Sequence, residues 1–164
     1  MNDNNPRLGI DFGRVVMGAA AESGEADTVF LDGSHADAMR TPPEPHAFEV
    51  LARLVARFEQ RAWLISKCGP RIEARTREWL AHHDFHARTG VPVGNLRFCR
   101  ARPEKAAHCR ELGITHMIDD RLDVHLALRG LVPHLYLYGH RREPAPDWVT
   151  HTPTWPDVEA ALTI

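Results

Sequence analysis

The sequence contains no apolar run long enough to cross a membrane, and residues 1–7 ("MNDNNPR") are polar, with no apolar signal region. The formal net charge is -2, so the excess of basic residues that is typical of nucleic-acid binding is also missing. We therefore expect no membrane partner and no nucleic-acid partner. We interpret residues 1–6 as a disordered lead-in to the first strand.

Cysteine is scarce, with three residues that show no disulfide-framework spacing. The simplest interpretation is a reduced, cytoplasmic protein. Neither Cys-x-x-Cys nor His-Glu-x-x-His occurs, although the chain has eleven histidines. His82, His83 and His86 lie near the expected end of a helix, so we predict a solvated helix-terminal cluster there rather than a zinc site.

Internal repeats, low-complexity tracts and linkers are also missing from the 164 residues, of which 43% are hydrophobic and 26% charged. This size and composition predict a single domain over residues 1–164 that can bury a core.

Apolar runs alternate with amphipathic segments along the chain. Strands are expected over residues 7–12, 61–69, 95–100, 114–120 and 132–139. Helices are expected over residues 45–60, 70–84, 102–113 and 121–130. This alternation predicts an α/β fold of three layers, Rossmann-like, around a parallel sheet.

Two segments depart from that alternation. Residues 13–45 contain two short β-like pieces, "RVVMG" and "TVFLD", which predict a β-hairpin flap followed by a Pro-rich loop. Residues 141–164 are expected to form a Pro-rich tail that ends in a short helix.

Polar side chains stand where the expected strands end. The residues are Asp11, Ser66 with Lys67, and Asp119 with Asp120; Lys105 lies early in the helix after the third strand. In parallel sheets ligands bind at the carboxyl ends of the strands, so these side chains can converge. Each residue alone has an ordinary explanation as a turn, helix-start or surface residue. Their order and placement together favour a site.

An oxygen-only cluster of carboxylates suits Mg²⁺. A carboxylate beside that ion can attack a phosphoryl group and form an aspartyl phosphate. The Ser66 hydroxyl, the backbone N–H groups of "SKCGPR" at a helix start and the charge of Lys105 are suitable donors for the phosphate.

Four short motifs resemble those of the haloacid dehalogenase (HAD) superfamily. They are "IDFGRV", "LISKCG", Lys105 within "RPEKAAHC", and "MIDDRLD", in that order. The resemblance spans residues 7–139 and implies a HAD-like fold.

The resemblance also implies roles for the metal ligands. Asp11 would be the nucleophile and a Mg²⁺ ligand, and the backbone carbonyl of Gly13 would be a second ligand. Asp120 would be the third, with Asp119 in or near the metal shell. The implied activity is Mg²⁺-dependent hydrolysis of a phosphate ester or anhydride.

At the phosphate end, the resemblance implies roles for two residues, and the sequence offers two further candidates. Ser66 and Lys105 would hold the phosphate and take part in catalysis. Lys67 is a further candidate contact to substrate, and Arg14 either touches substrate anions or points to solvent.

What is missing beside Asp11 is the second Asp that phosphatases of this family usually carry two residues later, because Gly13 stands there. A general acid contributes typically about 10²–10⁴-fold. Either a good leaving group or a substitute acid compensates, with Asp32, His35 and Asp37 as candidates. Alternatively, the bond that breaks is carbon–phosphorus or carbon–halogen, or the protein binds Mg²⁺ or a phosphorylated ligand in a regulatory role without turnover.

A cap domain is also missing, because the two family insertion points hold too few residues for one. An open site predicts either a small phosphorylated molecule enclosed by a partner chain, such as the second copy in a homodimer, or an exposed phosphate on a larger substrate. Residues 13–45 are the only candidate lid.

Overall fold

The computed structural model describes residues 5–18 and 25–162, which form a six-stranded sheet in the order β3-β2-β1-β4-β5-β6. All neighbouring strands are parallel. The strands are β1 (Leu8–Ile10), β2 (Ala62–Lys67), β3 (Leu96–Cys99), β4 (His116–Asp119), β5 (His134–Tyr138) and β6 (Thr150–Thr152). The predicted parallel α/β architecture is confirmed.

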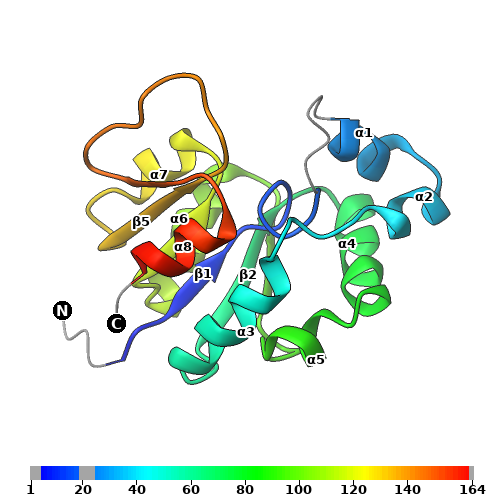
Figure 1. The fold of residues 1–164 in the computed structure, drawn as a ribbon, viewed down its shortest axis with the longest axis horizontal. Coiled ribbons are helices and arrows are strands. Elements are labelled where there is room, and N and C mark those ends of the chain that lie inside the picture. Colours follow the sequence, from blue (N-terminus) through cyan, green and yellow to red (C-terminus); the bar gives the residue numbers. More distant parts are fainter. Residues whose placement is uncertain (1–4, 19–24, 163–164) are drawn as a thin grey trace.

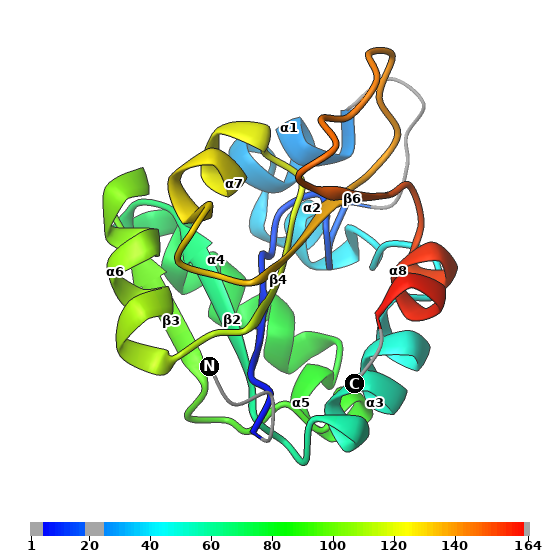
Figure 2. The same cartoon turned by 90° about the vertical axis from the view of Figure 1, so that its left-hand side faces the viewer.

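Helices cover both faces of the sheet, which gives three layers (Figure 2). One face carries α6 (Arg102–Leu112) and α7 (Leu122–Leu128). The other carries α3 (Ala47–Arg57), α4 (Pro70–His82), α5 (Phe85–Thr89) and α8 (Trp155–Ala161). Two further helices, α1 (Glu25–Asp32) and α2 (His35–Arg40), lie beyond the carboxyl end of β1 (Figure 1).

Strand alternation explains why the apolar runs are continuous. In β5, Tyr136 and Tyr138 join the core under α3 and α8, whereas Leu135 and Leu137 join the core under α6 and α7. Both faces of the strand are therefore buried from Leu135 to Tyr138, which explains why large apolar and aromatic side chains follow one another there.

Local signals set the ends of the main helices. Pro70 occupies the first turn of α4, where its missing N–H is not needed. Gly113 ends α6 with φ +65°, a left-handed conformation that glycine adopts without a Cβ penalty. Thr154 and Asp157 form a capping box at the start of α8.

The strand order places the site. The chain runs outward through β1, β2 and β3, and then returns to the other side of β1 for β4, β5 and β6. The strand order thus reverses between β1 and β4, which is the topological switch point of the sheet. The connections that leave β1 and β4 run in opposite directions, which opens a crevice at the carboxyl ends of these two strands. The residues directly after these strands therefore face a ready-made binding site.

The predicted β-hairpin over residues 13–45 is wrong. Residues 25–32 and 35–40 are helical, and Met17 makes only isolated bridges, with Gly13 and Pro43. A short apolar run such as "TVFLD" does not distinguish helix from strand, and here Phe30 is buried while Ser34 caps α2. Residues 19–24 of the predicted flap lie outside the described residues.

Two short elements escaped the sequence pattern. Residues 85–89 form α5, and residues 150–152 of the tail form β6 at the sheet edge. Neither is long enough to show a hydrophobic periodicity.

Most of the predicted lead-in, residues 1–4, lies outside the described residues. Arg7 is held in place, because its backbone N–H donates to Thr115 Oγ1 at 2.8 Å.

Within the described ranges, no helix has both the length and the apolar character needed to span a membrane.

Candidate functional site

The loop after β1 positions Asp11. The Asp11 N–H donates to the Ile118 carbonyl at 2.9 Å, which extends the ladder between β1 and β4 by one bond. The chain then turns tightly, since the Phe12 carbonyl accepts N–H groups from Val15, Val16 and Met17 at 2.9–3.2 Å. Backbone hydrogen bonds thus fix both sides of Asp11.

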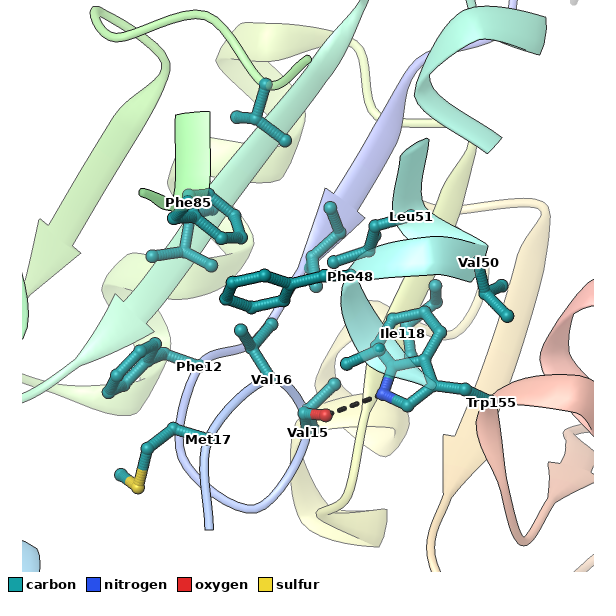
Figure 3. Close-up of a cluster of buried hydrophobic side chains, with 14 of the residues drawn as sticks. Phe12, Val15, Val16, Met17, Phe48, Val50, Leu51, Phe85, Ile118 and Trp155 are labelled. Atoms are coloured by element: carbon teal, nitrogen blue, oxygen red, sulfur yellow. Dashed lines mark hydrogen bonds between the residues drawn. The ribbon is translucent and has the colours of Figure 1, made fainter. Parts of the chain in front are cut away.

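The C-terminal helix supports the same loop. Trp155 is buried at the start of α8, and its Nε1–H donates to the Val15 carbonyl at 2.7 Å, within a cluster of apolar side chains (Figure 3). A buried indole needs an acceptor, and a loop carbonyl needs a donor. The contact therefore ties the loop beside Asp11 to α8.

Three carboxylates meet where β1 and β4 end. Oxygen atoms of Asp11, Asp119 and Asp120 all lie within 4.8 Å of one another. Asp11 is 8% exposed and Asp119 is fully buried. Like charges this close and this far from water repel strongly, so they need a cation.

Lys105 supplies one positive charge. Its Nζ lies 2.9 Å from Asp11 Oδ1 and 2.7 Å from Asp119 Oδ2, and the side chain is 3% exposed. Lys105 lies in the second turn of α6, and the expected convergence of Asp11, Asp119, Asp120 and Lys105 is what the structure shows.

Asp119 is held by its own neighbours. Its Oδ1 accepts the Arg121 N–H at 2.9 Å, and its backbone carbonyl lies 3.0 Å from His125 Nε2, which therefore donates. His125 is buried on α7, and this burial lowers its pKa. Both side-chain oxygens of Asp119 thus have protein donors, while Asp120 faces the cavity.

Burial and mutual repulsion set the protonation of the carboxylates. Burial and then the Asp119 charge raise the pKa of Asp11, while Lys105 opposes this shift. Burial and then the charges of Asp11 and Asp119 raise the pKa of Asp120. Burial alone would lower the pKa of Lys105, but Asp11 and Asp119 outweigh it and raise that pKa. The cluster therefore has more acid than one lysine neutralises.

A cavity of about 430 Å³ opens onto this cluster. One half is polar and holds Asp11, Gly13, Arg14, Ser66, Lys67, Lys105 and Asp120. The other half is lined mainly by apolar residues of the loop, α1 and α4: Phe12, Met17, Phe30, Leu31, Ile72 and Thr76. Such a volume and mixed lining are usual for a small-molecule site.

The predicted phosphate contacts line the polar half. Ser66 is 6% exposed near the end of β2, whereas Lys67 and Arg14 are exposed at the mouth. The backbone contributes less than expected, because the Cys68 N–H already donates to the Cys99 carbonyl at 3.0 Å and Pro70 has none. Burial raises the pKa of the Cys68 thiol, which makes Cys68 a poor nucleophile.

The three residues considered as a substitute acid do not line the cavity. His35 pairs with Glu78 at 3.0 Å, and Asp37 donates its backbone N–H to the Ser34 hydroxyl that caps α2 and pairs with Arg40 through its side chain. Asp32 is exposed at the end of α1. Their position in the chain suggested that they lie close to Asp11, but none of the three contributes to the cavity wall.

Ring nitrogens of the predicted histidine cluster bond to backbone carbonyls. His83 Nε2 lies 2.7 Å from the Met39 carbonyl, and His86 Nδ1 lies 2.7 Å from the Val91 carbonyl. His83 packs against Trp79 and is only part-exposed, so this side chain is less solvated than expected. Among the described residues, the acidic cluster is the one group of three with metal-ligating geometry.

Sequence reasoning missed two arginines and one threonine in the cavity wall. Arg102 and Arg121 both pair with Asp123 beside the polar half. Thr76 is fully buried, and its hydroxyl finds no hydrogen-bond partner among the described residues. The arginines stand three residues before Lys105 and directly after Asp120, which is a usable signal, whereas Thr76 carries none.

The donor set fits a hard divalent cation. Carboxylate oxygens are the ligands that Mg²⁺ prefers, and the residual negative charge of the cluster is what such an ion would neutralise. Asp11 and Asp120 line the cavity and would hold the ion with the Gly13 carbonyl. Nitrogen and sulfur ligands for a softer metal are not part of the cluster.

No protein-family model matches the sequence, and it matches no curated protein sequence either. Among solved structures, the chain is similar to a haloacid dehalogenase-like family hydrolase from Xanthomonas campestris. The alignment covers 95% of this chain and 93% of that one, with a TM-score of 0.64 and 12% sequence identity. With the strand order and the crevice at β1 and β4, this likeness shows that the chain has the haloacid dehalogenase-like fold.

Proposed function

We propose that this protein is a Mg²⁺-dependent phosphohydrolase that acts on a phosphate ester or anhydride through an aspartyl phosphate on Asp11. The observation that carries the proposal is the hydrogen-bonded arrangement at the switch point. Lys105 bridges Asp11 and Asp119, while Asp11 and Asp120 face a cavity that Ser66 also lines.

Asp11 has the features of a nucleophile. Its Oδ1 is held by Lys105, and its other oxygen, Oδ2, would attack phosphorus in line with the leaving group. The oxygen–phosphorus bond to the leaving group breaks as the bond to Asp11 forms. Water then hydrolyses the aspartyl phosphate, which releases phosphate and restores the carboxylate.

The neighbouring residues stabilise the transferring group. Lys105 and the Ser66 hydroxyl are placed to hold its oxygens, with Lys67 and Arg14 at the mouth. Asp11, Asp120 and the Gly13 carbonyl would hold Mg²⁺, which supplies charge neutralisation for those oxygens. Asp119 would lie in or near the metal shell, and it accepts a hydrogen bond from Lys105, which holds Lys105 beside Asp11.

The substrate is a small phosphorylated molecule or a phosphate exposed on a larger one, because the cavity accepts a compact group and opens at one side. We also propose that a second copy of the chain, in a homodimer, encloses the site. The proposed location is the cytoplasm.

One observation favours a second candidate, a protein that binds a phosphorylated ligand for regulation without turnover. Gly13 brings no side chain, so the cavity has no carboxylic acid where a leaving group would need a proton. Hydrolysis and binding differ in whether phosphate is released.

The experiment is phosphate release across phosphomonoesters, sugar phosphates, nucleotides and acyl phosphates, with and without Mg²⁺. We expect Mg²⁺-dependent release from the substrates with the best leaving groups. Asp11→Asn should abolish it, because an amide does not attack phosphorus, while the similar shape keeps the fold. Circular dichroism and thermal melting of the variant control for folding.

Phosphate release that persists in Asp11→Asn would show that Asp11 is not the nucleophile. Binding of Mg²⁺ and phosphate with no release from any substrate would move the conclusion to the regulatory binding protein.

A further inference from the structure

The apolar half of the cavity has a shape and chemistry that the phosphate chemistry does not explain. Its wall consists of Phe12 and Met17 from the loop, Phe30 and Leu31 from α1, and Ile72 and Thr76 from α4. Phe12, Met17 and Phe30 are each at most 2% exposed, so they form the packed layer behind this wall. The apolar surface that a ligand can contact comes from Leu31, which is 39% exposed, and from the partly buried Ile72.

A row of side chains on α4 fixes that wall. Arg71, Arg75 and Trp79 of α4 are spaced four residues apart, and His83, the residue at the C-cap, continues the same stripe. Each donates to a backbone carbonyl of the segment 30–41. The acceptors are Leu31 for Arg71, Phe30 and Gly33 for Arg75, Thr41 for Trp79, and Met39 for His83, at 2.7–3.0 Å.

These bonds make the wall preformed rather than assembled around a ligand. The Phe12 ring also contacts Phe30 at 5.7 Å and Trp79 at 5.3 Å between centroids. A cavity of roughly 150 Å³ suffices for a benzene-sized ring, and this one has about 430 Å³ in total. A ring and a phosphate therefore fit together.

The same wall disfavours a sugar. Among the wall residues, the one side-chain polar group is the Thr76 hydroxyl, and it is fully buried. A leaving group with several hydroxyls would lose hydrogen bonds to water and regain few of them. An aromatic ring loses no hydrogen bonds to water when it enters the cavity, and it buries its apolar faces.

The absence of a carboxylic acid at residue 13 also favours a phenol as the leaving group. A phenol has a pKa near about 10, far below that of an aliphatic alcohol, so a phenolate leaves without a proton donor. The apolar wall and Gly13 are independent features, and both suit the same leaving group.

We propose that the substrate class is the phosphate monoester of a phenol, with the aromatic ring in the half of the cavity between α1 and α4. This inference rests on the proposed function. The Asp11–phosphorus bond forms and the phosphorus–oxygen bond to the ring breaks, with the electron pair leaving on the phenolate. Solvent protonates the phenolate, and water hydrolyses the aspartyl phosphate.

The test compares phenyl phosphate with acetyl phosphate, whose leaving group is also good but has no ring. Ile72 is only part-buried, so Ile72→Trp should fold and fill the apolar half. We expect it to lower kcat/KM for phenyl phosphate by at least about tenfold, and acetyl phosphate by less than about twofold. Val29→Ala, on the same helix as Phe30 but 41% exposed and outside the cavity, should change neither.

Binding without turnover gives a second readout. In the presence of Mg²⁺, calorimetry should show phenylphosphonate bound at least about tenfold more tightly than methylphosphonate. Ile72→Trp should remove that difference.

The outcomes separate the two proposals. Hydrolysis of acetyl phosphate with an equal loss for both substrates in Ile72→Trp, or equal binding of the two phosphonates, would overturn the phenol assignment and leave the phosphohydrolase standing. No release from acetyl phosphate or any ester, together with tight phenylphosphonate binding, would overturn the hydrolase and retain the ring site.

Discussion

At the residue scale, the main feature of the site is its excess of negative charge. Asp11, Asp119 and Asp120 share a small buried volume, and Lys105 neutralises only one of them. Separate burial of each carboxylate would cost several kcal/mol. The cluster therefore keeps a negative charge that a divalent cation would neutralise.

Gly13 is the residue whose replacement is most informative. No described atom lies within 4 Å of the position that a Cβ would take there. Gly13→Asp should therefore fold without a clash and place a carboxylic acid beside Asp11. We expect hydrolysis of poor leaving groups, such as an alkyl phosphate, to rise by about 10²-fold, as measured by kcat/KM.

Gly13→Asn is the matched control, because it adds the same volume without an acid. An equal gain in the asparagine variant, or no gain in an aspartate variant that still folds and binds Mg²⁺, would show that the missing acid does not limit the rate.

At the element scale, α4 determines the shape of the cavity. Its N-terminus follows Ser66 and Cys68, and its donor stripe holds the carbonyls of α1 and α2. The helices α1 and α2 are short and lie outside the sheet. Their stability therefore depends on these hydrogen bonds and on the buried Phe30 side chain. Helices this short are marginal without such tertiary support.

Arg75→Met tests this dependence. The variant removes the charged donor to the Phe30 and Gly33 carbonyls, at 2.8 and 3.0 Å, and keeps the aliphatic part of the side chain. A hydrogen bond to a charged group contributes roughly 1.5–3 kcal/mol. Amide hydrogen exchange in residues 30–41 should therefore become at least about tenfold faster.

Arg77→Met is the comparison on the same helix, since Arg77 pairs with Glu73 and covers the Phe98 ring instead. Exchange in residues 30–41 that is equally fast in both variants would mean that α4 as a whole, and not the Arg75 bonds, sets the stability of α1 and α2.

At the scale of the whole molecule, the site joins parts that are remote in sequence. The loop after β1 is held by Trp155 from α8, and Lys105 on α6 reaches across to β1 and β4. Because the same groups contribute to the core and to the site, ligand binding and global stability should be coupled.

Thermal unfolding with Mg²⁺ measures this coupling. At an ion concentration 100-fold above Kd, the stabilisation should be about 2.7 kcal/mol, which raises Tm by roughly 5–10 °C for a chain of this size. NaCl at matched ionic strength should not reproduce the shift, since screening is weak for buried charges.

Asp120→Asn should lose most of the Mg²⁺ effect, because it removes a carboxylate that faces the cavity. The same increase in Tm in this variant as in the unchanged protein would place the ion elsewhere.

The sequence by itself determined the sheet strands β1 to β5, the main helices and the motif residues at the strand ends. These features are local, since an apolar run, a capping residue or a polar residue after a strand depends on near neighbours. The positions of Asp11, Ser66, Lys105 and Asp119–Asp120 followed from that pattern together with the rule for parallel sheets.

Only the tertiary structure decided the rest. The helical form of residues 25–40 depends on donors from α4, and β6 depends on the edge that β5 offers. The apolar half of the cavity joins a loop, α1 and α4, and the bond from Trp155 to Val15 spans almost the whole chain. Such contacts join residues with no local signal for one another, so their energies act only when the folded chain brings them together.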